Sequence, residues 1–341
     1  MVEVTHEASM KEYNNLLRNP PKGPLVSLKP PRAQHYSVEA RSVVAMVRSE
    51  SRIQGLEQAI SLIGGMDVLC KDVEGDILIK PNCNTDDPYP RDTHPDTIRT
   101  IANMILATGF PHDRIVVGEI SGRYRGLPTR YTLENLGIKE VADELGLRVC
   151  CFDEEEWVTV KPQESKAWPD GIKIPRQVHE ADRVILTPIL RPHSNAVFTM
   201  SLKLAVGMID AVSREWLHDG RDFMEKMVEL NLAYSADMVV ADATRVYTGS
   251  SQDFRNVAEP GVIIAGSNRV ATDAVCVALM RLHGADRVSD RPTLEYEQFR
   301  IGERLGLGSP RLGDMELKSL DLVGDPGFED VVNWIEEELD A

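Results

Sequence analysis

The sequence predicts an α/β protein whose mostly parallel sheet is covered by helices on both faces. Near-continuous Val and Ile runs alternate with helical patterns along the chain, which is typical of buried parallel strands joined by helices. Hydrophobic residues make up 42% of the 341 positions and charged residues 27%, so the chain can bury a large core. A division of this fold into two Rossmann-like lobes is the alternative arrangement.

Residues 1–40 form a proline-rich N-terminal arm, and residues 41–341 form the α/β domain. The arm has no sustained hydrophobic period. We therefore expect an extended strap lying over the domain, or a partly disordered segment. A weak break at residues 155–175 is where two lobes would divide.

Short apolar runs and amphipathic runs follow one another in order along the domain. Strands are expected at 42–48, 75–80, 113–120, 147–153, 181–190, 236–243 and 261–266. Helices are expected at 52–65, 94–109, 133–146, 196–212, 222–235 and 271–284. Pro95 and Gly109 stand at the start and end of the second helix, as helix-terminus preferences require. The segment at 157–175 is expected to form a hairpin.

Polar residues follow four of the predicted strands at the point where each strand ends. Lys80 ends the second strand, Glu119 the third, and Asp242 the penultimate one, while Arg191 and His193 directly follow the strand at 181–190. In open parallel sheets, ligands bind in the crevice outside the carboxyl ends of the strands. We expect these side chains to surround one crevice. The alternative is that each strand simply turns polar as it leaves the core.

Lys203 lies among Leu202, Leu204 and Ala205 in the apolar helix expected at 196–212. A lysine is almost never fully buried without a partner or a shifted pKa. Lys203 therefore either serves a site or extends along the helix to reach water.

Three further residues support a site around Lys203. Thr199 and Gly207 would share its helix face at spacings of four residues, and glycine permits close approach to that face. His193 and His218 bracket the same segment.

The segment "KPNCNTDDPYPRDTHPD" at residues 80–96 is expected to form one wall of the site. Lys80 and Asn82 would point into the crevice, and the four prolines would stiffen the loop. His94 would lie at the start of the next helix, where backbone N–H groups favour an anion. The alternative for His94 is N-capping of that helix.

Asp273 and the segment at 247–252 are two further polar features of the sequence. Asp273 falls in the first turns of the helix at 271–284, where a carboxylate favours the positive helix end. The small polar segment at 247–252 could form a backbone cradle for an anion. No P-loop, G-x-S-x-G, H-E-x-x-H or G-x-G-x-x-G motif occurs.

Charge and cysteine content argue against several classes of function. The net charge of -16 disfavours a nucleic-acid or anionic-membrane partner, yet permits a local basic pocket for a small anion. The five cysteines contain no C-x-x-C pair, so we expect reduced thiols, a cytoplasmic location and no iron–sulfur cluster bound by this chain. No apolar run reaches membrane-spanning length.

A series of motifs resembles the family catalogued as domain of unknown function 362. They are "ILIKPN", "THPDTIRTIANMILATG", "IVVGEISG", "EADRVILTPILRPHSNAVFTMSLKLAVGMI", "VVADATRVYTG" and "GVIIAGSNRVATDAVCVALM", within residues 42–310. Many members of that family carry a ferredoxin-like Cys-rich segment, which this chain lacks. The family commonly has Lys where Arg191 stands here, and Asn where Leu204 stands. The order of polar motifs is also loosely similar to that of the nickel-pincer lactate racemase superfamily.

The function expected is that of an enzyme acting on a small anionic or carboxylated metabolite, with a divalent metal as an option. Lys80, Lys203, His193 and Asp242 are the catalytic candidates. The ligand-binding candidates are Asn82, His94, Arg191, Thr199 and Gly207. The metal-ligand candidates are His193, His218, Glu119 and Asp242. The alternatives are a non-catalytic anion-binding or cofactor-binding protein, and a redox accessory that works with a separate ferredoxin-like protein.

Overall fold

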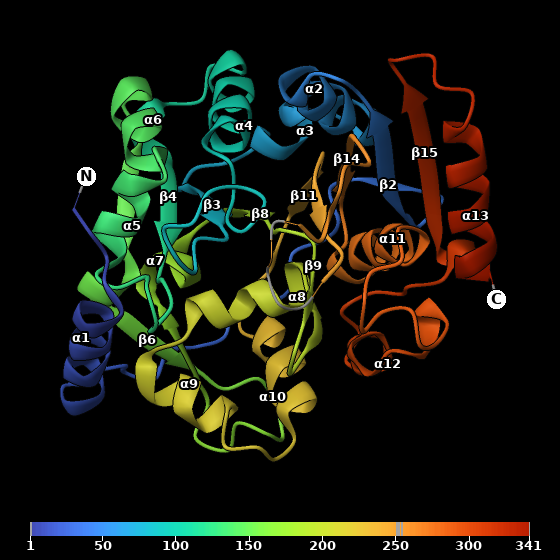
Figure 1. Ribbon diagram of the computed structural model, residues 1–341. Coiled ribbons are helices and arrows are strands. Elements are labelled where there is room, and N and C mark those ends of the chain that lie inside the picture. The colour runs from blue at the N-terminus through green and yellow to red at the C-terminus, as the bar shows by residue number, and fades with distance from the viewer. Residues whose placement is uncertain (1, 250–252, 254, 341) are drawn as a thin grey trace.

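The computed structural model describes residues 2–249, 253 and 255–340, and its centre is one large sheet (Figure 1). The strands of this sheet are β1 (Ser37–Val38), β2 (Arg41–Arg48), β3 (Ile77–Pro81), β4 (Ile115–Glu119), β5 (Arg148–Cys151), β8 (Arg183–Thr187), β11 (Met238–Ala243), β14 (Val262–Gly266) and β15 (Met315–Asp321). Three two-stranded ribbons lie outside it. They pair β6 (Trp157–Val160) with β7 (Ile172–Pro175), β9 (Arg191–His193) with β10 (Val197–Thr199), and β12 (Val246–Tyr247) with β13 (Val257–Ala258).

The sheet has the order β1-β2-β14-β11-β8-β3-β4-β5, and β15 pairs with β2. Strands β11, β8, β3, β4 and β5 are mutually parallel, whereas β14 is antiparallel to both of its neighbours. The expected mostly parallel sheet and the hairpin at 157–175 are both confirmed. The segment at 155–175 does not divide the sheet, because β8, which follows it, pairs with β3, which precedes it.

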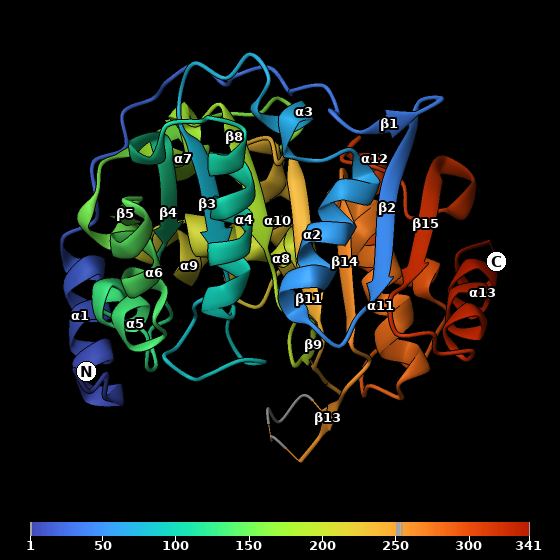
Figure 2. The same ribbon diagram turned by 90° about the horizontal axis from the view of Figure 1, so that it is seen from above.

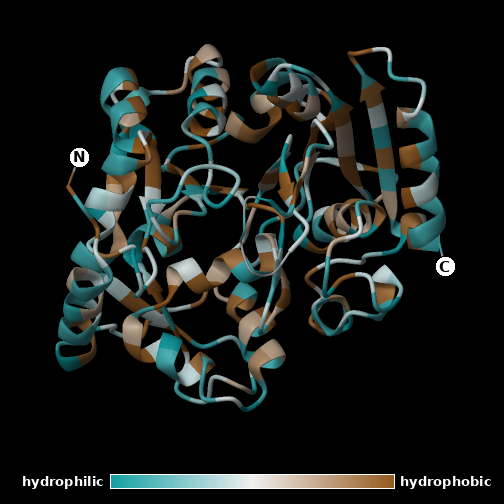
Figure 3. Cartoon of the chain, in the orientation of Figure 1, coloured by the Kyte–Doolittle hydropathy of each residue, from teal (hydrophilic) through white to brown (hydrophobic). Residues whose placement is uncertain are grey.

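Helices cover both faces of the sheet (Figure 1). One layer contains α2 (Arg52–Ile63), α3 (Met66–Cys70), α4 (Pro95–Ala107), α5 (Thr129–Asn135) and α6 (Ile138–Leu145). The other side carries α7 (Arg176–Glu180), α8 (Ser201–Leu204), α9 (Ala211–Leu217), α10 (Phe223–Glu229), α11 (Arg269–Leu282), α12 (Glu297–Arg304) and α13 (Phe328–Asp340). Apolar residues concentrate on the central strands, and the outer helices alternate in hydropathy (Figure 3).

Two predicted helices differ in the structure. The helix expected at 133–146 is broken at Gly137, whose positive φ of 75° ends one helix and starts the next. The prediction of one long helix at 196–212 was wrong. That segment forms β10, the single turn α8, the short 3-10 helix η3 (Ala205–Met208) and the start of α9.

The N-terminal arm contains a helix that the sequence analysis missed. Helix α1 (His6–Arg18) begins after Thr5, whose side chain accepts a hydrogen bond from the amide of Ala8. Tyr13 anchors it to α9 by donating to the carbonyl of Ala211 at 3.1 Å. Beyond α1 the arm is extended, as expected. It passes over the amino-terminal ends of strands such as β3 and β8, on the side away from their carboxyl ends (Figure 2).

Candidate functional site

A cavity of about 310 Å³ lies at the carboxyl ends of the parallel strands. Lys80 at the end of β3 and Glu119 at the end of β4 form its floor, and Arg191 enters from β9 just after β8. Lys203 on α8 and His218 after α9 close the cavity from the other side. The expected crevice at the strand ends therefore exists, and three of the four strand ends contribute to it.

The cavity is strongly cationic although the whole chain is acidic. Among the described residues that line it, Glu119 is the one carboxylate. The lining cations are Lys80, Arg91, Arg123, Arg191, Lys203 and Arg214. A net charge of -16 for the chain makes this positive surface local.

Lys80 and Glu119 form a buried ion pair beneath the cavity. Lys80 Nζ donates to Glu119 Oε1 at 2.7 Å, and Glu119 also accepts from the amides of Cys83 and Ile120. Burial lowers the pKa of Lys80 and raises that of Glu119, while each charge opposes the shift of the other. A Cβ on Gly207 would come within 2.7 Å of Lys80 Nζ and 2.8 Å of Glu119 Oε1, so any larger residue there would have to displace the ion pair.

Lys203 has a different environment from Lys80. It is half-buried, and within residues 2–249, 253 and 255–340 its ammonium has neither a hydrogen bond nor an ion pair. Burial, followed by the charges of Arg191 and Arg214, lowers the pKa of Lys203 to about 7. It reaches the cavity rather than bulk solvent along a helix, which favours the site interpretation.

The backbone that carries Lys203 is held by a residue distant in sequence. Asp273 of α11 is buried and accepts hydrogen bonds from the amides of Ser201 and Leu202 at 3.0 and 2.9 Å. It also accepts from the Ser201 hydroxyl at 2.6 Å. Asp273 therefore caps the N-terminus of α8. The expected interaction of its carboxylate with the N-terminus of its own helix, α11, is not the one that the structure shows.

Two buried arginines also form no ion pair within the described residues, although the charge of Asp92 acts on Arg191 and that of Glu119 on Arg214. Arg191 is 6% exposed, and its Nε has no hydrogen-bond partner among them. Arg214 donates to the carbonyls of Ser121 and Ile120 at 2.7 and 2.8 Å, which do not neutralise its charge. Burial lowers the pKa of both guanidinium groups. Buried unpaired cations are costly, so an anion in the cavity would relieve them.

The two histidines have opposite hydrogen-bonding roles. Nδ1 of His193 lies 3.2 and 3.1 Å from the amides of Asn195 and Ala196, so it accepts and the ring proton is on Nε2. Nδ1 of His218 lies 2.8 Å from the carbonyl of Arg214, so it donates, and Nε2 is an acceptor with no hydrogen bond from the described residues. Burial and nearby cations lower the pKa of His193 to about 2, which keeps it neutral.

The loop between β3 and α4 forms one wall, as predicted. Asn82 and Asn84 line the cavity together with Arg91. Asp92 pins this loop by accepting from the Asn84 amide and the Thr85 hydroxyl, at 2.7 and 2.8 Å. Burial raises the pKa of Asp92 to about 7.

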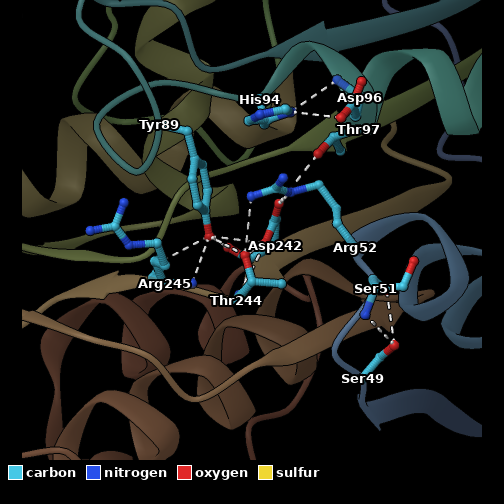
Figure 4. Close-up of polar contacts among 10 residues, drawn as sticks. All are labelled: Ser49, Ser51, Arg52, Tyr89, His94, Asp96, Thr97, Asp242, Thr244 and Arg245. Carbon is cyan, nitrogen blue, oxygen red and sulfur yellow. Dashed lines mark hydrogen bonds and ion pairs between the residues drawn. The ribbon is translucent and has the colours of Figure 1, made fainter. Parts of the chain in front are cut away.

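Asp242 and His94 do not line the cavity and form a separate cluster (Figure 4). Asp242 Oδ2 pairs with Arg52 Nε at 2.6 Å, and Oδ1 accepts from the hydroxyl of Tyr89 at 2.9 Å. These two interactions explain why the Asp242 carboxylate, at the end of β11, does not point into the crevice. Nδ1 of His94 accepts from the amide of Asp96 at 3.1 Å, which supports N-capping rather than ligand binding.

The metal-ligand set is not assembled. His193, His218 and Glu119 line the cavity, but no three His, Cys, Asp or Glu side chains in the described chain lie close enough together to hold a metal ion. Asp242 is engaged by Arg52, and Glu119 by Lys80. The option of a metal site therefore gains no support from these side chains.

Most of the sequence-predicted site residues come together. Those that line the cavity are Lys80, Asn82, Glu119, Arg191, His193, Thr199, Lys203, Gly207 and His218. Thr199 and Gly207 do so from β10 and η3, and the expected shared helix face does not exist. The sequence analysis missed Tyr13, Arg91, Arg123 and Arg214, because no local pattern distinguishes them from surface residues. Residues 250–252 of the expected anion cradle lie outside the described residues.

Comparison with known proteins gives a family, a similar protein and a solved structure with limited similarity. A family model described as Domain of unknown function (DUF362) matches residues 77–278. Thylakoid-associated protein sll1697 of Synechocystis sp. is 25% identical over 280 residues, covering 77% of this chain and 79% of that protein. The lactate racemase apoprotein of Thermoanaerobacterium thermosaccharolyticum has a TM-score of 0.43 and 13% identity, covering 73% of this chain and 58% of that one.

The comparisons leave the compartment open. In the described part of the chain, no helix is long and apolar enough to cross a membrane. The expected cytoplasmic location stays a prediction, as does the expectation that this chain binds no iron–sulfur cluster.

Proposed function

The chain belongs to the family called Domain of unknown function (DUF362), and on that premise we propose that it is an enzyme acting on a small carboxylated or otherwise anionic metabolite. The observation that carries the proposal is the cationic cavity. Lys203, Arg191 and Arg214 face a common space without a carboxylate partner among the described residues.

The charge arrangement favours a ligand with more than one negative charge. Glu119 already neutralises Lys80, so Lys203, Arg191 and Arg214 remain for the ligand. Guanidinium groups bind carboxylates and phosphates through paired hydrogen bonds. A volume of about 310 Å³ is at the small end of ligand pockets, which suits a compact metabolite.

Acid–base groups around the cavity support turnover rather than storage. Burial lowers the pKa of Lys203 to about 7, and His193 presents an N–H. His218 presents a nitrogen that can accept a proton, although burial lowers its pKa. The second candidate function is that of a carrier protein, which binds the same anion without converting it, because the cationic side chains alone are sufficient for binding. Conversion of a bound metabolite, followed by NMR, distinguishes the two.

The test is calorimetric titration with succinate, 2-oxoglutarate and inorganic phosphate, with dimethyl succinate as the neutral analogue. We expect at least one of the three anions to bind, and Arg191→Gln to weaken it by at least about tenfold. Arg130→Gln removes the same charge at an exposed position and is the matched control. Binding that is equally strong for the neutral ester, or equally weakened by both variants, would contradict the proposal.

A further inference from the structure

Lys203 differs chemically from the other buried lysines of this chain. Lys80 is held as an ion by Glu119 at 2.7 Å, and Lys226 by Asp219 at 2.5 Å. Lys203 lines the cavity, and no carboxylate among the described residues pairs with it. An amine that no carboxylate holds in its charged form is available to react.

We propose that Lys203 forms an imine with the carbonyl group of a small 2-oxo carboxylate bound in the cavity. This inference rests on the proposed function and deepens it, because it names both the substrate class and the covalent step. The geometry behind it is an amine without an ion-pair partner among the described residues, in a cationic cavity that Arg191 and Arg214 also line.

The environment activates the amine. Lysine becomes a nucleophile when it is desolvated or placed next to another cation, since both effects favour the neutral form. Both causes operate at Lys203 and lower its pKa to about 7, so a large share of the amine is neutral at physiological pH. The capping of α8 by Asp273 fixes the backbone on which this side chain stands.

The surrounding groups fit a 2-oxo carboxylate. Arg191 and Arg214 provide positive charge for the carboxylate. Because His193 Nδ1 accepts from backbone amides, its Nε2–H is free to donate to a carbonyl oxygen. His218 has the complementary arrangement and offers Nε2 as a proton acceptor.

The step balances without an external reagent. The ammonium of Lys203 gives one proton to Nε2 of His218, and the neutral nitrogen attacks the carbonyl carbon to form a C–N bond. The carbonyl π electrons move to oxygen, which takes up two protons, one returned by His218 and one from the attacking nitrogen. The oxygen leaves as water when the C–O bond breaks. Overall, an ammonium and a ketone give an iminium ion and water, with the positive charge and all hydrogens conserved.

The test is reductive trapping in the full-length protein. The protein is incubated with 2-oxoglutarate or pyruvate and cyanoborohydride, and its peptides are mapped by mass spectrometry. We expect the adduct at Lys203, and we expect competition by succinate, which carries the charge but no ketone. Lys80 and Lys226 serve as internal controls that remain unmodified. Lys203→Arg keeps the charge and should abolish the adduct.

The outcomes separate this inference from the proposed function. An adduct confined to Lys203 and competed by succinate supports the imine. Labelling spread over surface lysines, or unchanged in Lys203→Arg, overturns it. If succinate binds by calorimetry while neither ketone is trapped, the imine is refuted and the anion site stands. If no carboxylate binds and no adduct forms, both proposals fail.

Discussion

Replacing Lys203 by methionine should stabilise the folded protein, and the gain should depend on pH. Methionine keeps the length of the side chain and removes a charge that no described carboxylate neutralises. The pKa of Lys203 falls from 10.5 to about 7 in the folded state. At about 1.36 kcal/mol per pKa unit, this difference corresponds to roughly 5 kcal/mol, and water in the cavity should reduce it to about 1–3 kcal/mol.

The sign follows from proton linkage. A lysine with a lowered pKa destabilises the folded state fully below about pH 7, and the cost disappears as the pH rises toward the unfolded value of 10.5. Lys203→Met should therefore raise the free energy of unfolding at about pH 6 and change it little at about pH 10. Urea denaturation followed by circular dichroism at both pH values measures this directly.

Lys226→Met is the matched control. Lys226 is 2% exposed, pairs with Asp219 at 2.5 Å and lies 4.0 Å from the centre of a Trp216 ring. Removing its charge should lower stability, because a partnered carboxylate is left behind. Our interpretation of Lys203 would be refuted if Lys203→Met were less stable than wild type at about pH 6, or if its gain were the same at both pH values.

Three further substitutions test the frame around the cavity. Gly207→Ala should lower the free energy of unfolding, measured by urea denaturation, by about 1–3 kcal/mol, because its Cβ would meet the buried ion pair. Gly313→Ala is the control, since open space surrounds Gly313, and it should leave the free energy of unfolding unchanged. Equal effects of the two substitutions would contradict the close contact at Gly207. Glu119→Gln should cost about 3 kcal/mol, since it leaves a buried ammonium without its anion; an unchanged urea midpoint would show that the pair is not ionised. Tyr89→Phe should lower the free energy of unfolding by about 1–3 kcal/mol and speed amide hydrogen exchange in the loop that carries Tyr89. Unchanged exchange would mean that the hydrogen bonds of the Tyr89 hydroxyl do not hold that loop.

The location of the cavity was predictable because it follows from a rule about sheets. Residues that end parallel strands meet at one edge, and Lys80, Glu119 and Arg191 do so. The backbone of Asp242 also lies at this edge, at the end of β11. Its side chain, however, accepts a hydrogen bond from Tyr89, 153 positions away in the sequence. A long-range hydrogen bond of this kind leaves no trace in the local pattern.

The segment at 196–212 was mispredicted for a similar reason. Its apolar spacing is compatible with a helix, and local propensity alone would extend one through Lys203. Asp273 instead caps a new start at Ser201 from 72 positions away, and Gly207 has non-helical angles where it packs on the buried ion pair. Tertiary contacts therefore decide the path of the chain at the site itself.

The most direct test of the central claim is proton uptake on anion binding. Titrating succinate by calorimetry in buffers of different ionisation enthalpy, at about pH 7.5, measures protons bound with the ligand. An anion beside Lys203 raises the pKa of its ammonium, so we predict uptake of a fraction of a proton per succinate in wild type and little in Lys203→Met. Binding without proton uptake, or uptake that persists in Lys203→Met, would contradict the assignment of Lys203 to the anion site.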